Sequence, residues 1–255
     1  MGLFDLHSHL LPGVDDGAAT EEKSIDLARK AVSEGISHLV LTPHHFNNQY
    51  VNHKEDVIKA TEALQSIYRK LGISLQVFPS QEIRIQEDLG DNIAYSDDYL
   101  SLDTKGKYYL IEMPTKTVPK YALDVCKDMI SNGMIPVIAH PERNHQFAGN
   151  IRTLYPFIEA GCLGQLTSHS YIGLFGDKLR KVSKEMIEHN LVHLIASDAH
   201  HIKQRPFNLK EAYQQLEAEY GLRLVEYYQQ NAEAIFNGQS FNRLQPKLKK
   251  RFGLF

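Results

Sequence analysis

The chain has 255 residues, of which 42% are hydrophobic and 23% charged, a composition typical of soluble globular proteins. Its length suits one α/β domain, and its formal net charge of −3 provides no overall electrostatic attraction for nucleic acid. No stretch approaches the roughly 18–20 apolar residues that span a bilayer, and residues 1–6 lack the cationic and apolar regions of a signal peptide. We therefore expect a cytoplasmic protein without a transmembrane segment.

Six short apolar runs each end in a residue type that binds metals. In chain order they cover residues 4–9, 39–44, 75–82, 109–112, 137–140 and 194–200. Runs of this length, bounded by proline or glycine, are typical of buried strands in a parallel sheet. Because enzymes built on (β/α) barrels take their active residues from the carboxyl ends of several strands, the pattern predicts a metal cluster at one rim. It favours a metal-dependent hydrolase.

Amphipathic helical segments alternate with these strands. We expect helices over residues 21–34, 53–71, 120–132, 152–160, 174–190, 209–220 and 224–237. Thr20 is the predicted N-cap of the first helix. A seventh strand is predicted over residues 162–166, and the polar, acidic residues 86–107 are predicted to form a loop insertion. This alternation predicts a parallel sheet, either a barrel of seven strands or an open, doubly wound sheet.

Two pairs of potential ligands have the i, i+2 spacing that places both side chains on the same face of a strand. His7 and His9 form the first pair, on the first strand, and Asp198 and His200 form the second, on the last strand. In a closed barrel the first and last strands are neighbours. The four side chains could therefore meet across the mouth of the barrel and bind the same cluster of ions.

Single residues at the other strand ends extend this set. One carboxylate of Asp15 and Asp16 could fold back over the rim, and the other would then be a turn residue or a helix cap. At most one of His44 and His45 is expected in the site, because neighbouring residues of a strand point to opposite faces. Three more runs end in a potential ligand that, taken alone, also has a purely structural explanation: Glu82, Glu112 and His140.

The predicted set of nine residues exceeds what one ion requires, so two or three ions are expected. Mixed imidazole and carboxylate ligands without cysteine fit Mn, Fe, Zn or Co, and such ions hold the hydroxide nucleophile of a hydrolase. Arg143 and Arg205 follow predicted ligands closely, and their planar guanidinium groups favour a phosphate substrate. Cys126 and Cys162 have no arginine six residues later, which argues against a cysteine-based phosphatase.

These motifs resemble the polymerase-and-histidinol-phosphatase (PHP) superfamily and, within it, the bacterial manganese-dependent tyrosine-protein phosphatases of capsule and exopolysaccharide operons. The matching segments cover residues 5–17, 42–45, 81–83, 110–112, 136–143 and 196–200. The resemblance implies a distorted (β/α)7 TIM-like barrel of the PHP type in a single domain, residues 1–242, followed by a basic tail, residues 243–255. It also implies Mn2+ as the cofactor and, as the substrate, the phosphotyrosine tail of a partner bacterial tyrosine autokinase that controls polysaccharide export.

The resemblance further implies how three ions would share the ligands. With Glu82 as a bridge, the three sets would be His7, His9, Glu82 and Asp198; Glu82, Glu112 and His140; and Asp16, His44 and His200. Arg143 and Arg205 match the phosphate-binding arginines of the family. No role is assigned to His45 or His169.

Other functions are weighed against this one. A small-molecule phosphatase of the histidinol-phosphate type is the main alternative on the same scaffold. A nuclease is disfavoured by the acidic balance of the chain, and a purely structural metal site by the two arginines, because structural sites are closed. For the basic tail, both a solvated terminus and docking on an anionic membrane surface or a partner protein remain open.

Overall fold

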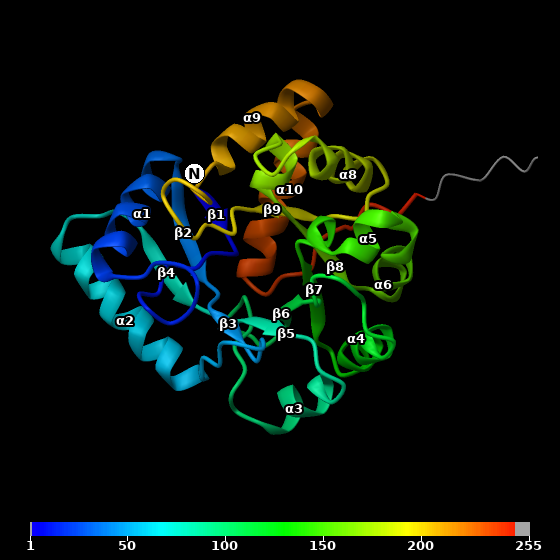
Figure 1. Ribbon diagram of the computed structural model, residues 1–255, viewed down its shortest axis with the longest axis horizontal. Helices are drawn as coiled ribbons and strands as arrows, with labels where there is room; N and C mark the ends of the chain where they lie inside the picture. Colours follow the sequence, from blue (N-terminus) through cyan, green and yellow to red (C-terminus); the bar gives the residue numbers. More distant parts are fainter. Residues whose placement is uncertain (1, 248–255) are drawn as a thin grey trace, which may run out of the picture.

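The computed structural model describes residues 2–247 as a mixed α/β fold with two parallel sheets. Hydrogen-bonded neighbours follow the order β1-β2-β4 in one sheet and β3-β5-β6-β7-β8-β9 in the other. The strands are β1 (Leu3–Asp5), β2 (Ile36–Leu41), β3 (His44–His45), β4 (Gln76–Pro79), β5 (Glu82–Arg84), β6 (Tyr108–Glu112), β7 (Ile135–Ala139), β8 (Leu163–Thr167) and β9 (Leu194–Ala196). Every pair of neighbours is parallel, as predicted. In Figure 1 the strands lie near the centre and the helices around them.

Backbone hydrogen bonds connect the two sheets at two places. β2 continues into β3, and β4 into β5, after two intervening residues each, and the Glu82 amide donates to the Pro43 carbonyl at 3.1 Å across this break. On the other side, an isolated parallel bridge pairs Ser8 with Ala199, where the His9 amide donates to the Ala199 carbonyl at 2.9 Å. The segments that follow the first and last strands therefore lie side by side, and their potential ligands come together.

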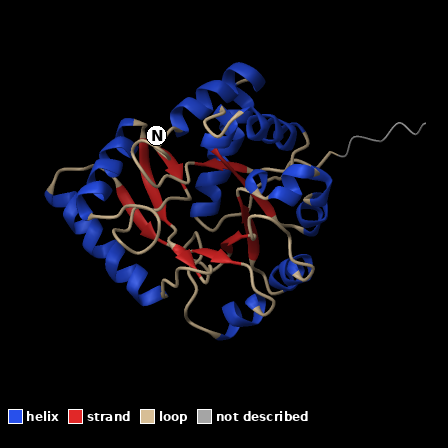
Figure 2. Cartoon of the chain, in the orientation of Figure 1, coloured by secondary structure: helices blue, strands red, loops and turns tan. Residues whose placement is uncertain are grey.

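The helices lie around the strands, except the last one, Leu222–Phe236, which lies near the centre of the view (Figure 2). They are α1 (Glu21–Ser33), α2 (Lys54–Lys70), α3 (Leu89–Tyr95), α4 (Ala122–Ser131), α5 (His145–Gly149), α6 (Tyr155–Ala160), α7 (Ser168–Ile172), α8 (Asp177–Glu188), α9 (Leu209–Tyr220) and α10 (Leu222–Phe236). α1 begins where the sequence predicts, because the Thr20 hydroxyl accepts a hydrogen bond from the Lys23 amide at 3.3 Å.

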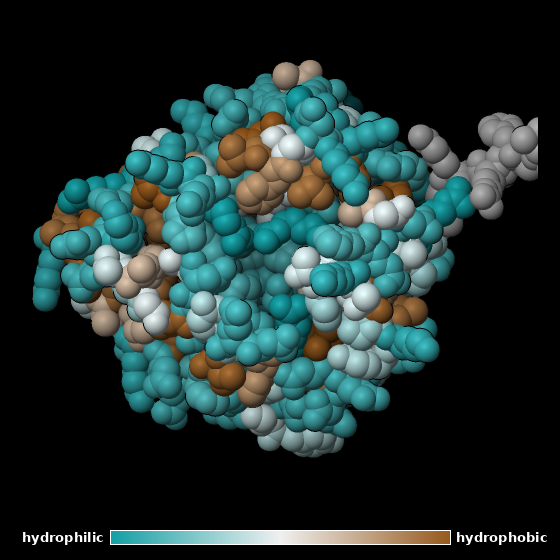
Figure 3. Space-filling model, in the orientation of Figure 1, coloured by the Kyte–Doolittle hydropathy of each residue, from teal (hydrophilic) through white to brown (hydrophobic). Residues whose placement is uncertain are grey.

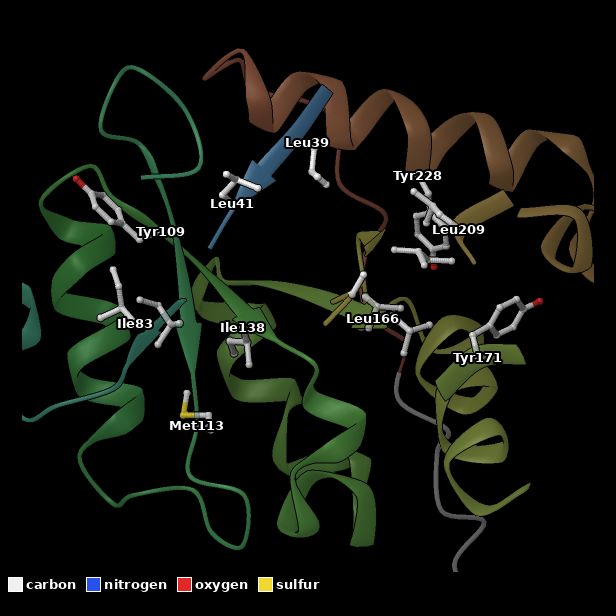
Figure 4. Packing of buried hydrophobic residues seen from close by; sticks show 14 of the residues in the cluster. Leu39, Leu41, Ile83, Tyr109, Met113, Ile138, Leu166, Tyr171, Leu209 and Tyr228 are labelled. Carbon is white, nitrogen blue, oxygen red and sulfur yellow. The ribbon is translucent and has the colours of Figure 1, made fainter. Parts of the chain in front are cut away.

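Side-chain alternation along the strands separates two apolar clusters. In β6, Tyr108 and Leu110 belong to an inner cluster that includes Ala232 of α10, whereas Tyr109 and Ile111 belong to an outer cluster that packs against the surrounding helices. Figure 4 shows part of the outer cluster, with Tyr109 and other strand residues facing helical ones.

Three segments differ from the prediction. Residues 86–107 are not wholly a loop, because α3 lies within them. The helix predicted over residues 174–190 begins only at Asp177, since Gly173 and Gly176, with φ of 89° and 94°, separate it from α7. The helix predicted over residues 152–160 is divided between a 3-10 turn and α6.

Among the described residues, none of the helices combines the length and the apolar character needed to cross a bilayer. The first residues of the predicted basic tail pack on the domain. The Lys247 amide donates to the His189 carbonyl at 2.8 Å, and the Arg243 guanidinium donates to the Gly161 carbonyl. The rest of that tail, residues 248–255, lies outside the described residues.

Candidate metal centre

The structure brings all nine predicted ligands together at the carboxyl ends of the strands. Their potential ligand atoms form four overlapping groups, in each of which all atoms lie within 4.8 Å of one another. The groups are His9, Asp16, His44 and His200; His7, His9 and Asp198; His7, Glu82 and His140; and His44, Glu82 and Glu112. Figure 3 shows a hydrophilic hollow in the middle of the face on which the loops after the strands lie.

His7 and His9 point their Nε2 atoms at each other, 3.2 Å apart. His7 Nδ1 lies 2.8 Å from Gln165 Oε1, and the Gln165 amide nitrogen donates to the Leu166 carbonyl, which fixes the oxygen toward the imidazole. His9 Nδ1 is held in the same way by the Asp15 carboxylate at 2.7 Å. With both Nδ1 atoms directed at acceptors, the two rings turn their Nε2 atoms into the same space, and replacement of the Nε2 protons by a cation would give two metal-binding imidazoles.

The adjacent carboxylates of Asp15 and Asp16 have different partners. Asp15 Oδ2 accepts from His9 Nδ1 and, at 3.2 Å, from the His44 backbone amide. Asp16 Oδ1 lies 3.3 Å from His44 Nε2 and 3.5 Å from His200 Nε2. The geometry thus places Asp16 among the potential ligands, while Asp15 orients His9. Spacing left the choice between them open and the family resemblance implied Asp16, but neither identified the contact between Asp15 and His9.

Glu82 lies at the centre of the set and contacts four imidazoles, those of His7, His9, His44 and His140. Its Oε1 is 2.8 Å from His140 Nε2, and its Oε2 is 3.0 Å from His44 Nδ1 and 3.3 Å from His7 Nε2. Burial alone would raise the pKa of Glu82, but the charges of His7 and His44 and a hydrogen bond from His140 lower it well below its usual value. The carboxylate is therefore ionised in the interior, where a cation would stabilise it.

Glu112, at the end of β6, lies beside Arg84 of the neighbouring strand, with 2.9 Å between Oε2 and the guanidinium. Burial, together with the charge of Glu82, raises the pKa of Glu112 to about 7. The sequence analysis did not single out Arg84. Its position two residues after Glu82, on the same face of one strand, is the signal that could have identified it.

Asp198 divides its two carboxylate oxygens between the potential metal groups and the arginines. Oδ1 lies 3.3 Å from His7 Nε2 and 3.4 Å from His9 Nε2. Oδ2 accepts hydrogen bonds from Arg205, at 2.5 Å, and from Arg143. Burial would raise the pKa of Asp198, but Arg205, His7 and Arg143 hold it well below its usual value. Both predicted phosphate-binding arginines thus converge on a residue that also faces the histidine pair.

Two of the potential ligands have left-handed backbone conformations. His140 has a φ of 32° and Asp198 a φ of 54°, which are costly for residues other than glycine. Strain of this kind is typical of functional sites, where the surrounding structure holds it in place. At His140 the turn leads from β7 directly into the 3-10 turn Pro141–Arg143, which returns Arg143 toward Asp198.

The donor set fits bound cations. Within residues 2–247, buried atoms of the site that lack a well-formed hydrogen bond include Glu82 Oε2, Asp198 Oδ1, His44 Nδ1 and His200 Nε2. Buried polar atoms normally have partners, so this concentration of unpartnered donors and acceptors at one place requires an explanation. Imidazole nitrogens and carboxylate oxygens without thiolates suit Mn, Fe, Co or Zn at a catalytic site.

His45 and His169 lie outside the four groups. His45 is buried with its ring centroid 4.1 Å from that of Phe46 and 5.3 Å from that of Tyr99, and burial lowers its pKa to about 4. His169 Nε2 donates to the Pro206 carbonyl at 2.7 Å. The His45 Nε2 atom also lies 3.8 Å from Asp98, away from the four groups, so only one of the two adjacent histidines faces the site, as the sequence predicts.

Comparison with known proteins identifies the family. Residues 3–237 match the family described as capsular polysaccharide synthesis, CpsB/CapC. The chain is 42% identical over 256 residues to the tyrosine-protein phosphatase YwqE of Bacillus subtilis (strain 168), covering 99% of this chain and 100% of that protein. It is 37% identical over 258 residues to the putative tyrosine-protein phosphatase CapC of Staphylococcus aureus, with coverage of 99% and 100%.

A solved structure supports the same relationship. It comes from crystallographic work on YwqE from Bacillus subtilis and CpsB from Streptococcus pneumoniae, described there as metal-dependent tyrosine phosphatases. The match has a TM-score of 0.93 at 42% identity and covers 97% of this chain and 99% of that chain. The family predicted from the sequence motifs is confirmed, and the chain belongs to the CpsB/CapC family.

Proposed function

We propose that this chain is a metal-dependent phosphotyrosine protein phosphatase of the cytoplasm. Its substrate would be the phosphorylated tail of a partner bacterial tyrosine kinase that controls capsular or exopolysaccharide synthesis. The observation that carries the proposal is the cluster of unpartnered imidazole and carboxylate atoms with two arginines beside it. The phosphatase names of the full-length relatives YwqE and CapC support the substrate class.

Mn2+ is the cofactor that we propose, in two or three ions held by the nine residues of the four groups. The sharing of ligands implied by the sequence resemblance can be refined by the distances. His9 belongs to two of the four groups, with Asp16, His44 and His200 as well as with His7 and Asp198, and His44 also lies beside Glu82 and Glu112. Because its Nδ1 donates to Asp15, His9 would hold one ion through Nε2, in a place between two groups. Glu82, whose two oxygens face different imidazoles, would be the residue shared between ions.

The protein groups have defined tasks in the proposed hydrolysis. Bound ions of this kind supply a water nucleophile of lowered pKa and neutralise charge on phosphorus-bound oxygens. Arg143 and Arg205 would bind the remaining phosphate oxygens through their guanidinium groups and hold the phosphorus in line with that nucleophile. Asp198 keeps both guanidinium groups in place. The leaving phenolate, with an ordinary pKa of about 10, needs little help from an acid.

We also propose that the two sheets form one distorted (β/α)7 barrel, comprising residues 1–242 as a single domain followed by the basic tail, residues 243–255. The bridge between Ser8 and Ala199 supports this, because it lies where the first and last strands of a barrel would join. A barrel places the ends of all strands at one rim and so accounts for ligands that are almost two hundred residues apart in the chain.

The test compares substrates on one preparation. Purified protein supplied with Mn2+ is assayed on a phosphotyrosine peptide, histidinol phosphate and an oligonucleotide. The proposal expects turnover of the peptide far above that of the other two. Preferred hydrolysis of histidinol phosphate would instead support a small-molecule phosphatase, and preferred cleavage of the oligonucleotide a nuclease.

A His9→Ala variant tests the site itself. It should abolish turnover while circular dichroism and the unfolding transition show an intact fold, because the lost imidazole belongs to two of the ligand groups. His201→Ala, at an exposed histidine close in sequence to His200, is the matched control and should retain activity. Retained activity in His9→Ala would refute the site.

A further inference from the structure

One aromatic side chain beside the arginines has no part in the proposed hydrolysis. Phe175 lies in the turn between α7 and α8, is half-buried, and has its ring centroid 5.8 Å from Arg143 Cζ. The turn is fixed by Gly173 and Gly176, whose φ values of 89° and 94° are rarely accessible to other residues. A Cβ at Gly173 would also lie 3.1 Å from the Arg180 side chain, so the turn has little room to rearrange.

His169 supports Phe175 from the interior. The two rings are stacked, with centroids 5.2 Å apart and planes inclined by 27°. His169 Nε2 donates to the carbonyl of Pro206, the residue after Arg205, at 2.7 Å. Burial lowers the pKa of His169 to about 4, so the ring is neutral at pH 7. Phe175 is therefore held against the segments that carry both arginines.

We propose that Phe175 lines a binding subsite for the aromatic ring of the substrate phosphotyrosine. This inference rests on the proposed function, because it places the phosphate on Arg143 and Arg205. In phosphotyrosine the ring is attached directly to the bridging oxygen of the phosphate, so a ring must lie close to any guanidinium that binds that phosphate. The Phe175 ring centroid is 5.8 Å from Arg143 Cζ, so Phe175 lies beside the place where that ring would enter. Two aromatic rings attract each other at centroid separations of about 4.5–7 Å.

The subsite would contribute to specificity. A phosphoserine side chain has only one methylene group where phosphotyrosine has its ring, and it would leave Phe175 without a partner. His169, to which the sequence analysis assigned no role, becomes a positioning residue for this subsite. Through this stacking contact His169 would affect substrate binding by holding the Phe175 ring in place.

The experiment compares Phe175→Ala, Phe175→Tyr and Leu174→Ala in the Mn2+-supplied protein. Leu174 is the matched control, because it lies in the same turn, is 50% exposed and loses a similar apolar side chain. Each variant is assayed for kcat/KM on phenyl phosphate and on a phosphotyrosine peptide, and for inhibition by inorganic phosphate, which has no ring. Phe175→Ala should lower kcat/KM on both ring substrates about three- to tenfold. Phe175→Tyr and Leu174→Ala should stay close to the parent protein.

The phosphate inhibition constant separates binding of the ring from positioning of the arginine. The inference expects this constant to be unchanged in Phe175→Ala, since inorganic phosphate does not occupy the subsite. A weakened phosphate inhibition parallel to the loss of kcat/KM would overturn it, because Phe175 would then act only by holding Arg143. An unchanged kcat/KM in Phe175→Ala would overturn it too. If the parent protein hydrolysed neither ring substrate, the proposed function itself would be wrong. If the parent hydrolysed both and Phe175→Ala did so equally well, only the ring subsite would be wrong.

Discussion

Asp198 connects the two halves of the proposed chemistry through a single carboxylate. One oxygen faces the imidazoles of His7 and His9, and the other accepts hydrogen bonds from Arg143 and Arg205. A charge-assisted hydrogen bond of this kind fixes a guanidinium more firmly than solvent would. Asp198 therefore ties the position of the two arginines to the position of the metal groups. If one arginine is removed, the other still binds Asp198, so the metal groups should stay intact.

Removing Arg143 should separate phosphate binding from metal binding. We expect Arg143→Ala to lower kcat/KM on a phosphotyrosine peptide by about 10²- to 10³-fold, the usual cost of losing one donor to developing charge. Bound manganese, measured by elemental analysis, should stay constant. The exposed Arg29 on α1 provides the control variant Arg29→Ala, which should be unaffected. Loss of metal in Arg143→Ala would show that this arginine is structural.

For single residues, the sequence predicts which side chains meet at the site, but not which of them face the ions and which orient a neighbouring side chain. The i, i+2 spacing predicts that His7 and His9 share a face, and the structure keeps both in the site although β1 ends at Asp5. Spacing could not distinguish Asp15 from Asp16, since a loop between glycines lets either carboxylate turn inward. Nor did it identify Gln165, a polar residue within an apolar strand, which holds the His7 ring by a bond across 158 residues of sequence.

The loop after β1 approaches the strand closely, and Gly17 permits this. A Cβ at Gly17 would lie 2.1 Å from the His9 carbonyl oxygen and 2.5 Å from the His9 Cβ. The His9 backbone is held by hydrogen bonds to Ala199 and Ala18. The same loop carries Asp15 and Asp16, whose contacts with His9 and His44 depend on its position.

Substitution of Gly17 should therefore displace the loop. We expect Gly17→Ala to destabilise the protein by about 1–3 kcal/mol, as overpacking does, and to weaken Mn2+ binding in titration calorimetry. Gly149→Ala is the control, because no atom lies within 4 Å of a Cβ there. Unchanged Mn2+ affinity in Gly17→Ala would mean that the loop position is irrelevant to the site.

A buried histidine joins β8 and β9 at the end opposite the site. The Gly164 amide donates to His193 Nδ1 at 3.1 Å, and the Asn231 side chain donates to the His193 carbonyl at 2.8 Å. Burial, with a smaller effect of the Arg243 charge, lowers the pKa of His193 to about 3. The unfolded chain, with an ordinary histidine, therefore takes up the proton first as the pH falls.

This difference predicts an acid-sensitive element. Stability from His193 is complete above the unfolded pKa of about 6.5 and is lost as the pH falls from there toward 3, by about 2 kcal/mol between pH 7.5 and 5. His193→Asn keeps an acceptor for the Gly164 amide but cannot be protonated. Urea unfolding across this range should show a shallower pH dependence in the variant. Equal slopes in both proteins would contradict the assignment.

The bounds of helices could be predicted where a capping residue or apolar periodicity marks them. They could not be predicted where the backbone conformation of a turn sets the start of the helix. α9 has the predicted bounds, and α1 begins at its predicted cap. The helix predicted to start at residue 174 instead starts at Asp177, because two glycines in left-handed conformations form a turn that apolar periodicity does not reveal. That turn carries Phe175, so the proposed ring subsite lies in a segment whose structure the sequence did not predict.

Across the whole molecule, the strands deliver acidic and imidazole groups from six segments to one rim. Several of these groups are buried without well-formed hydrogen bonds, and bringing their charges together opposes folding. The convergence itself could be predicted, since parallel strands share one carboxyl edge. The number of ions that each side chain contacts could not, because it depends on ångström-scale distances set by packing.

Cations should therefore stabilise the fold as well as support activity. Mn2+ that binds only the folded chain should add about 2.7 kcal/mol for each site at a free concentration of 100 Kd. A thermal unfolding series with increasing Mn2+ should show a rising Tm in the parent protein and a much smaller rise in His9→Ala. A Tm that is independent of Mn2+ would contradict a cluster that is bound in the native state.

The most direct test of the metal cluster is a titration of chelator-treated protein with Mn2+, in which bound metal and phosphotyrosine hydrolysis are measured on the same samples. The account predicts no activity in the stripped protein and full recovery as about two to three ions bind per chain. Full activity in protein whose elemental analysis finds no transition metal would contradict it.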